Sequence, residues 1–303
     1  MRRAPPHRSP SPRGEPAASD GRPSCRTLVG LVSLLVVAGV MALGALGGLL
    51  GSLLGLGGGV FLVPFLTIGL GLPFRQAAGI GLMTVIATSS VVSAQRAGDG
   101  TVNLRLGIVL EIATTIGGLA GGLTALALSQ RTLHVAFGVV ALAIAGVMFR
   151  QLDARNALPE GDTDTGWLGG RFYSAESDRL VTYRVHRLPV ALAMSFLAGN
   201  VSGLLGIGGG ILKVPALTAW CGVPLRVAAT TSSLMIGVTA VASAPLYYTA
   251  GDILPQYAAA SVLGVMVGTR VGFRLAERAR ARRLKLLLGC VLVLVAVMML
   301  VRA

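Results

Sequence analysis

Long apolar runs separated by short polar connections dominate the chain after residue 27. A transmembrane helix needs about 20 consecutive, mostly apolar residues, and eight runs come close to that length or exceed it. They cover roughly residues 28–54, 76–95, 104–128, 133–150, 188–205, 227–249, 255–276 and 284–302. The pattern therefore predicts an all-α polytopic membrane protein with about eight transmembrane helices.

Two polar stretches interrupt this pattern. Residues 1–27 are rich in Arg, Pro and Ser and contain almost no large apolar residue, which is typical of a disordered basic tail. The apolar run that follows is too long for a signal peptide and has no clear cleavage site, so we interpret it as the first membrane helix. Residues 151–187 carry many charged side chains and predict a polar connecting loop, with a short amphipathic piece around 167–173.

The chain also repeats itself. The segment from Gly48 to Leu66 aligns with the segment from Gly199 to Leu217, and the match continues without a gap over about fifty residues. All matched positions differ by 151, as in Gly57 with Gly208, Pro64 with Pro215, Arg75 with Arg226 and Gly100 with Gly251. We therefore predict a duplication, with transmembrane repeat 1 at residues 28–150 and transmembrane repeat 2 at residues 188–303.

Each repeat places a Gly-x-Gly-Gly-Gly cluster inside apolar sequence, at Gly55–Gly59 and at Gly206–Gly210. Glycine costs a helix about 1 kcal/mol relative to alanine, so three in a row are expected to open it. Freed backbone groups persist in a membrane only inside protein or beside a watery cavity. Paired breaks of this kind are typical of transporter binding sites. The alternative is that the glycines only allow close helix crossing.

The apolar pieces near 60–71 and 211–222 are too short to span a bilayer and would be half-helices after the two breaks. Their N–H groups and positive dipole ends would lie near mid-membrane, where an anion is the natural ligand. The candidate substrate-binding residues are the cluster glycines, one lysine and a hydroxyl pair on the next helix. They are Gly57, Gly58, Gly59, Gly208, Gly209, Gly210, Lys213, Thr231 and Ser232.

Two charged residues lie inside apolar sequence. Lys213 is about one turn into the second half-helix, and its counterpart in repeat 1 is Leu62. Because a lysine at mid-bilayer costs about 2.5–3.5 kcal/mol on insertion scales, it either attracts an anion beside the site, pairs with Glu111, or snorkels to an interface. Glu111 is a candidate for proton coupling. It could equally pair with Lys213 or lie near the interface.

Composition narrows the function classes. Hydrophobic residues make up 53% of the chain and charged residues 13%, about half the charged share of a soluble protein. The net charge of +14 comes largely from cations that flank apolar runs, which indicates membrane headgroups rather than nucleic acid. The three histidines and three cysteines are scattered, so we expect neither a metal site nor any cofactor.

A family resemblance follows from the motifs. The paired Gly-x-Gly-Gly-Gly-x-x-x-x-Pro segments, the Pro and Arg after each, and Gly100-Thr-Val-Asn103 with Gly251-Asp-Ile253 resemble the sulfite exporter TauE/SafE family from about Leu28 onward. The resemblance implies a membrane transporter of about eight helices in two repeats, moving sulfite or small sulfur-containing or organic anions, often outward. Family halves usually carry Thr-Ser after the half-helix. Repeat 2 has this pair at Thr231-Ser232, whereas repeat 1 has Ile80-Gly81.

These observations together predict a secondary transporter, working as an exporter, in the cell inner (plasma) membrane. A small anion such as sulfite or an organosulfur anion would bind between the two half-helix N-termini and cross by alternating access, with proton or sodium coupling open. The alternatives are a passive anion channel, an intramembrane enzyme and a membrane scaffold. The enzyme is disfavoured because the chain has no His-Glu-x-x-His or Gly-x-Ser-x-Gly motif.

Overall fold

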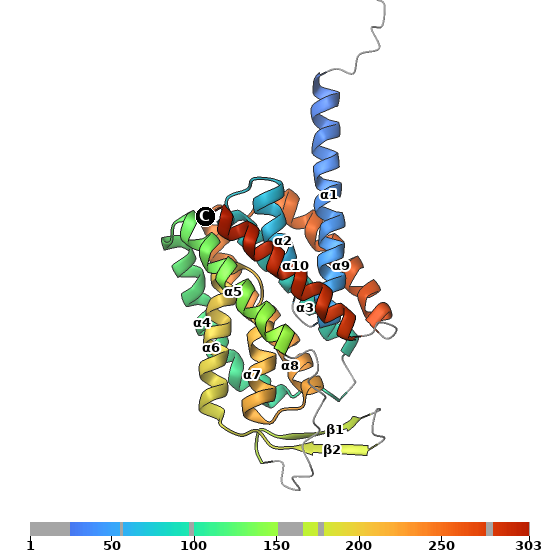
Figure 1. Ribbon diagram of the computed structural model, residues 1–303, viewed down its shortest axis with the longest axis vertical. Coiled ribbons are helices and arrows are strands. Elements are labelled where there is room, and N and C mark those ends of the chain that lie inside the picture. The colour runs from blue at the N-terminus through green and yellow to red at the C-terminus, as the bar shows by residue number, and fades with distance from the viewer. Residues whose placement is uncertain are drawn as a thin grey trace, which may run out of the picture. The chain divides into compact units, whose positions relative to one another are not determined.

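The computed structural model describes residues 25–54, 57–96, 100–150, 166–174, 179–276 and 281–302. Helices account for nearly all of them (Figure 1). In chain order they are α1 (Cys25–Leu54), α2 (Gly59–Pro64), the π-helical turn η1 (Phe65–Gly69), α3 (Phe74–Arg96), α4 (Leu104–Ala127), α5 (Gln130–Arg150), α6 (Leu188–Leu205), α7 (Gly210–Cys221), α8 (Leu225–Thr249), α9 (Pro255–Ala276) and α10 (Ala281–Val301). The polytopic helical architecture predicted from the apolar runs is confirmed.

Six of these helices are long and apolar enough to cross a membrane. The qualifying segments are Leu35–Ser52, Phe74–Arg96, Leu104–Ala127, Gln130–Val147, Leu188–Leu205 and Leu225–Thr249. Helices α9 and α10 have 22 and 21 residues. Of the predicted tail, residues 1–24 lie outside the described residues, and Cys25 already belongs to α1.

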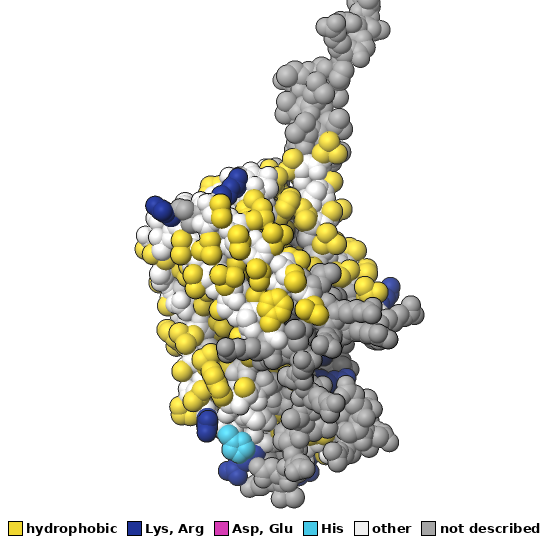
Figure 2. All heavy atoms as spheres, viewed as in Figure 1, with side chains coloured by type: hydrophobic (Ala, Val, Ile, Leu, Met, Phe, Trp, Pro, Cys, Tyr) yellow, Lys and Arg dark blue, Asp and Glu magenta, His cyan; other side chains and the backbone are white. Residues whose placement is uncertain are grey.

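The outer faces of the helices are apolar, as a bilayer requires. On α4, for example, Ile108, Ile112 and Ile116 are all more than half exposed. On the face shown in Figure 2, hydrophobic side chains cover the helices and the Lys and Arg side chains lie mainly toward helix ends. This distribution is expected where lipid tails surround the middle of the helices and charged headgroups surround their ends.

Elements of the second half begin 151 positions after those of the first. The pairs are α2 and α7, starting at 59 and 210, α3 and α8 at 74 and 225, α4 and α9 at 104 and 255, and α5 and α10 at 130 and 281. Side-chain detail recurs as well. The hydroxyl of Thr67 donates to the carbonyls of residues 63 and 64, and that of Thr218 donates to those of residues 214 and 215, at 3.0 Å in each case.

Helices α3 and α8, which begin 151 positions apart, run in opposite directions. The start of α3 lies beside the α4–α5 connection, because Phe74 N–H donates to Gln130 Oε1 at 2.7 Å. The start of α8 lies at the other end of the bundle, where Gly222 sits close to His186 before α6. We call the end with Gly100 and Gly222 the hairpin end and the end with Gly71 and Gly251 the opposite end. Gly79 near the start of α3 lies against Tyr247 near the end of α8, and Ser89 farther along α3 lies against Gly237, so the two helices are antiparallel.

Small residues let the helices approach closely. A Cβ atom added to Gly117 or Gly121 of α4 would collide with the backbone of α6 at Phe196 or Asn200. Gly264 and Gly268 of α9 face α1 in the same way at Met41 and Ala45. Such contacts replace the hydrophobic drive that is missing between helices in lipid.

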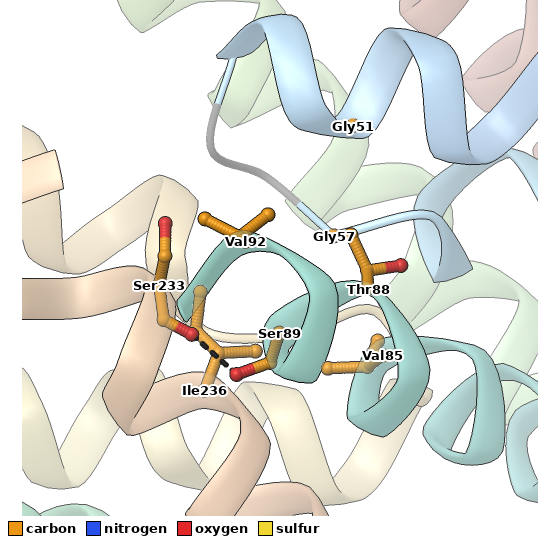
Figure 3. A pocket seen from close by; sticks show the side chains of 8 residues that line it. All are labelled: Gly51, Gly57, Val85, Thr88, Ser89, Val92, Ser233 and Ile236. Carbon is orange, nitrogen blue, oxygen red and sulfur yellow. Dashed lines mark hydrogen bonds between the residues drawn. The ribbon is translucent and has the colours of Figure 1, made fainter. Parts of the chain in front are cut away.

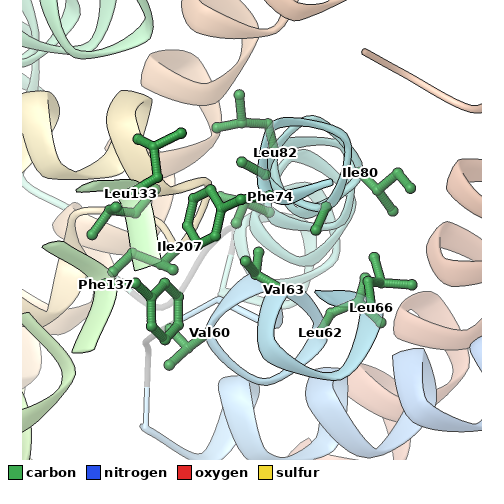
Figure 4. Packing of buried hydrophobic residues seen from close by; sticks show 14 of the residues in the cluster. Val60, Leu62, Val63, Leu66, Phe74, Ile80, Leu82, Leu133, Phe137 and Ile207 are labelled. Carbon is green, nitrogen blue, oxygen red and sulfur yellow. The ribbon is translucent and has the colours of Figure 1, made fainter. Parts of the chain in front are cut away.

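The first half-helix is buried among other helices. Figure 4 shows side chains of α2 and η1 packed against α3 and α5. The cluster includes Val60, Leu62, Val63, Leu66, Phe74, Ile80, Leu82, Leu133, Phe137 and Ile207, all at most 2% exposed. Its interrupted backbone is therefore shielded from lipid by protein, as a broken membrane helix requires.

Part of the central stretch forms a β-hairpin, which corrects the prediction of a loop with an amphipathic piece around 167–173. Strand β1 (Gly170–Ser174) pairs antiparallel with β2 (Arg179–Tyr183), with Phe172 opposite Val181. The hairpin forms because alternate residues, Phe172, Val181 and Tyr183, enter a buried cluster with α4, α7 and α8. Residues 151–165 and 175–178 of the predicted loop lie outside the described residues.

Asn103 holds the hairpin to the membrane helices. Its Nδ2 donates to Leu168 O and to Tyr183 Oη, both at 2.8 Å, while its Oδ1 accepts from Leu106 N–H and caps α4. Burial raises the pKa of the Tyr183 phenol, and the hydrogen bond from Asn103 lowers it less. The phenol therefore stays neutral at physiological pH and keeps this contact.

Candidate functional site

The two glycine clusters interrupt the helices and meet inside the bundle. Helix α6 ends at Leu205 and α7 begins at Gly210, and α1 ends at Leu54 before α2 begins at Gly59. A Cβ atom on Gly59 would collide with the carbonyl oxygen of Gly206, and one on Gly57 would lie 3.8 Å from that of Ile207. The interruption between α6 and α7 lies at the second glycine cluster, as expected from the sequence, and the contact between the two clusters is a finding of the tertiary structure. Gly55 lies outside the described residues.

The backbone at both breaks needs glycine. Gly57 and Gly208, matched by the repeat, have φ values of +76° and +80°, a region that costs residues with a side chain energy. Gly58 N–H donates to Thr88 Oγ1 at 3.4 Å. Gly209, the N-cap of α7, makes no side-chain capping hydrogen bond. The first N–H groups of α7 lack α-helical partners by construction and have no side-chain cap, although Leu212 N–H donates to Gly209 O at 3.3 Å.

Lys213 is buried beside this junction. Its side chain is 1% exposed, and its Nζ lies 3.9 Å from Glu111 Oε2 on α4. Snorkelling to an interface is therefore wrong, and the pairing with Glu111 is confirmed. The separation exceeds a hydrogen bond, and neither Lys213 Nζ nor Glu111 Oε2 has a hydrogen-bond partner.

Glu111 is held on its other oxygen. Oε1 accepts from Thr239 Oγ1 of α8 at 2.8 Å and from Thr115 Oγ1 at 3.3 Å. The carboxylate is thus oriented so that one oxygen is satisfied and the other faces the ammonium across a gap. The buried ammonium therefore keeps donors that no hydrogen bond uses.

The predicted hydroxyl pair is split by the structure. Thr231 Oγ1 accepts from Asn103 N–H at 3.0 Å, so it secures the connection before α4. Ser232 is fully buried, and its Oγ has no hydrogen-bond partner. Ser202 of α6 has the same property. An unmet buried polar group costs about 1–3 kcal/mol, so both hydroxyls stay in the interior at a cost in stability.

The structure explains why repeat 1 lacks the hydroxyl pair. A Cβ atom on Gly81 would stand 2.6 Å from the carbonyl oxygen of Gly206 and 2.7 Å from Val63 Cγ2. Ile80 is fully buried in the apolar cluster. Repeat 1 therefore uses this turn of α3 to pack against the second break.

Two cavities lie between α3 and α8. The smaller has a volume of about 10 Å³, room for about one water molecule, and is lined by Gly51, Gly57, Val85, Thr88, Ser89, Val92, Ser233 and Ile236 (Figure 3). The larger, at the hairpin end, has a volume of about 430 Å³ and is lined by Val92, Ser93, Arg96, Gly100, Val102, Leu104, Thr230 and Leu234. Val92 lines both, so the two cavities are neighbours along α3.

Sequence reasoning missed the α3 residues of these cavities. Thr88 and Ser89 sit in an apolar helix, where hydroxyls usually bond to their own backbone. The signal that could have found Thr88 is its repeat counterpart Thr239, which contacts Glu111. Among the residues that the structure describes, no three His, Cys, Asp or Glu side chains cluster to hold a metal ion.

Comparison with known proteins settles the family. The model of the family described as "Sulfite exporter TauE/SafE" matches residues 40–299. The chain belongs to this family. The predicted resemblance is therefore confirmed over most of the chain, and the protein is a membrane transporter of the TauE/SafE family.

Curated relatives agree with this assignment. The chain is 26% identical over 263 residues to "Probable membrane transporter protein YunE" of Bacillus subtilis, covering 84% of this chain and 94% of that protein. A probable membrane transporter protein of Methanocaldococcus jannaschii is 24% identical over 279 residues, covering 86% and 92%. "Sulfite exporter TauE/SafE family protein 5" of Arabidopsis thaliana is 46% identical over 59 residues, 20% of this chain and 13% of that protein. No solved structure matches.

Proposed function

We propose that this TauE/SafE transporter is a secondary exporter of a small anion such as sulfite or an organosulfur or organic anion. The anion binds where the two breaks meet, between the N-terminus of α7 and Lys213. One observation supports this most directly: a fully buried ammonium without a hydrogen bond lies about one turn from an uncapped helix N-terminus. Both features attract a negatively charged group. Among the described residues, Glu111 is the acidic side chain that lies beside them.

The architecture that supports transport is a pair of inverted repeats, residues 28–150 and 188–303. We propose that α9 and α10 also span the membrane, which gives eight spans with α2 and α7 as short broken-helix segments. Inverted repeats with discontinuous helices at matching positions allow alternating access, because each half can adopt the conformation of the other. The relatives' names favour a transporter over an enzyme, and the cell inner membrane is the proposed location.

In this proposal, Glu111 couples proton binding to anion binding. An anion that approaches Lys213 also approaches the free Glu111 oxygen, and the like charges repel each other. Protonation of Glu111 would relieve this repulsion, so proton entry and anion binding would favour one another. Sodium is the alternative coupling ion. The passive anion channel stays the competing function, since it needs the same site without coupling.

Thermal stabilisation by anions tests the proposed site. Purified protein in detergent is heated with sulfite, sulfate, thiosulfate, sulfoacetate or acetate, beside Lys213→Ala and the control Arg131→Ala, which removes an exposed cation. A ligand at 100 times its Kd adds about 2.7 kcal/mol of stability. We expect one anion to raise the melting temperature of the wild type and of Arg131→Ala but not of Lys213→Ala. The absence of any shift in folded protein would contradict the anion site.

Flux measurements then separate transporter from channel. Protein in liposomes is given the stabilising anion with and without an opposing proton or sodium gradient. A secondary transporter accumulates the anion against its own gradient when the coupling ion flows, whereas a channel only equilibrates it. Loss of the accumulation in Glu111→Gln, with downhill flux retained, is the expected result for proton coupling.

A further inference from the structure

The two ends of the bundle differ in access to the breaks. At the hairpin end, the cavity of about 430 Å³ reaches Val92, beyond which lies the small cavity at Gly57. The barrier between them is thin: Val92 and the hydrogen bond from Ser89 Oγ to the Ser233 carbonyl at 2.6 Å, drawn in Figure 3. Arg96 and Ser93 line the larger cavity, and Ser93 Oγ has no hydrogen-bond partner.

The repeat identifies the equivalent place at the opposite end. The counterparts of Ser93, Arg96 and Thr230 are Ala244, Tyr247 and Gly79, each displaced by 151 positions. Here the space is filled. Tyr247 is fully buried, and its hydroxyl donates to the carbonyl of Gly203 at 2.7 Å.

The packing around Tyr247 is tight. A Cβ atom on Gly79 would stand 3.1 Å from Ile253 Cγ1 and 3.3 Å from both the Asp252 carbonyl oxygen and Tyr247 Cβ. The Asp252 N–H in turn donates to the Tyr247 carbonyl at 2.9 Å. Residues that line an open cavity in one half thus have counterparts that fill the same position in the other half.

We infer that the structure is the conformation open at the hairpin end, that the cavity lined by Ser93 and Arg96 is the entrance for the anionic substrate, and that Tyr247 is the gate holding the opposite end shut. This inference rests on the proposed transport function. Because the repeats are inverted, opening of the opposite end requires the second half to adopt the present shape of the first. Tyr247 must then leave Gly203, and the space at Arg96 must close.

The cation at the entrance fits an anionic substrate. Arg96 is half-buried in the cavity wall, where a guanidinium raises the local concentration of anions. At the closed end the same position holds a phenol whose partner is a helix carbonyl, which suits a neutral seal. Arg96 thus lines the proposed entrance, whereas Tyr247 at the matching position forms the proposed gate.

Cysteine accessibility tests the gate without any substrate. In a background with Cys25, Cys221 and Cys290 replaced by Ala, Ser93→Cys and its repeat counterpart Ala244→Cys are exposed to a charged, membrane-impermeant thiol reagent in detergent, where water reaches both ends. Labelling is compared with that of denatured protein, which reports full reactivity. We expect fast labelling of Ser93→Cys and slow labelling of Ala244→Cys.

Tyr247→Phe supplies the decisive variant, because it removes only the hydroxyl and keeps the ring that packs the core. A neutral hydrogen bond is worth about a fivefold shift in an equilibrium, so labelling of Ala244→Cys should rise about fivefold in this variant while that of Ser93→Cys falls. Equal labelling of the two cysteines in the wild type, an unreactive Ser93→Cys, or no effect of Tyr247→Phe would overturn the inference. Labelling as expected together with no anion-induced stabilisation would retain the gate and reject the proposed substrate class.

Discussion

The two half-helices share their backbone design and differ in their chemistry. Both follow a glycine with positive φ, both contain a proline, and both carry a threonine that bonds back across it. Yet α2 and η1 present Leu62, whereas α7 presents Lys213 at the matching position. The partner differs too, since the counterpart of Glu111 is Val262.

This difference separates what the break requires from what the site requires. The first break forms with Leu62 at the position that Lys213 holds in the second, so a charged residue there is not needed to interrupt the helix or to pack it. A buried ion pair is weak support for stability, because desolvation offsets its attraction. The charge in repeat 2 is therefore consistent with the proposed ligand binding, and the four predictions below test this distinction.

The largest effect is expected where the breaks touch. Gly206 has φ of +69°, and a Cβ atom there would collide with the Ala78 carbonyl. Gly206→Ala should lower the free energy of unfolding by more than about 3 kcal/mol, because strained backbone and a backbone clash add up. Thermal unfolding in detergent measures it, and the control is Gly146→Ala, where nothing lies within 4 Å. Wild-type stability of Gly206→Ala would show that the second break tolerates a side chain against α3.

The next effect concerns the ion pair. Glu111→Val alone leaves Lys213 buried without a counter-charge and should cost about 3–5 kcal/mol. The double variant Glu111→Val with Lys213→Leu places at both positions the residues found at their repeat counterparts, Val262 and Leu62, and should return to within about 1 kcal/mol of wild type, since apolar replacements of buried pairs are often neutral. Anion-induced stabilisation should be lost in the double variant. Retention of that stabilisation would place the anion elsewhere.

A smaller effect distinguishes the two hydroxyl residues. Thr231→Val removes the acceptor of Asn103 N–H and should cost about 1–2 kcal/mol without anion. Ser232→Ala removes a hydroxyl that has no partner, so stability without anion should stay the same or rise by up to about 1 kcal/mol. The anion-induced shift should fall only in Ser232→Ala. The opposite pattern would make Thr231 the ligand.

The smallest effect compares two matched threonines. Thr88 accepts from Gly58 N–H at the first break, and Thr239 donates to Glu111. Thr88→Val should cost about 1 kcal/mol of stability at any pH. Thr239→Val leaves the carboxylate less solvated and should make anion binding more dependent on pH, measured as the change in apparent Kd between pH 6 and pH 8. Equal pH dependence in both variants would argue against a coupling role for Glu111.

Sequence reasoning reached most helices because the bilayer imposes a simple local rule. For each predicted membrane span, a helix begins within three residues of the expected start. The prediction works because apolar length and glycine placement act locally. It missed the β-hairpin, because the strands at 170–174 and 179–183 are stabilised by burial against α4, α7 and α8 rather than by their own pattern. In the sequence, the apolar residues of the hairpin are few and separated by polar ones, so only their burial against α4, α7 and α8 reveals the strands.

The site divides in the same way. The sequence alone determined the two glycine clusters, their spacing of 151 and the lone Lys213. Glycine destabilises a helix, and a charge in an apolar segment is costly to bury, whatever the tertiary structure. Tertiary structure decided which groups meet. Glu111 pairs with Lys213, which lies about a hundred residues later in the chain. Thr231 accepts a hydrogen bond from Asn103 N–H. Tyr247 fills the space that corresponds to the cavity beside its counterpart Arg96. These outcomes depend on how helices pack against one another, and packing distances are set by the whole bundle rather than by any one segment.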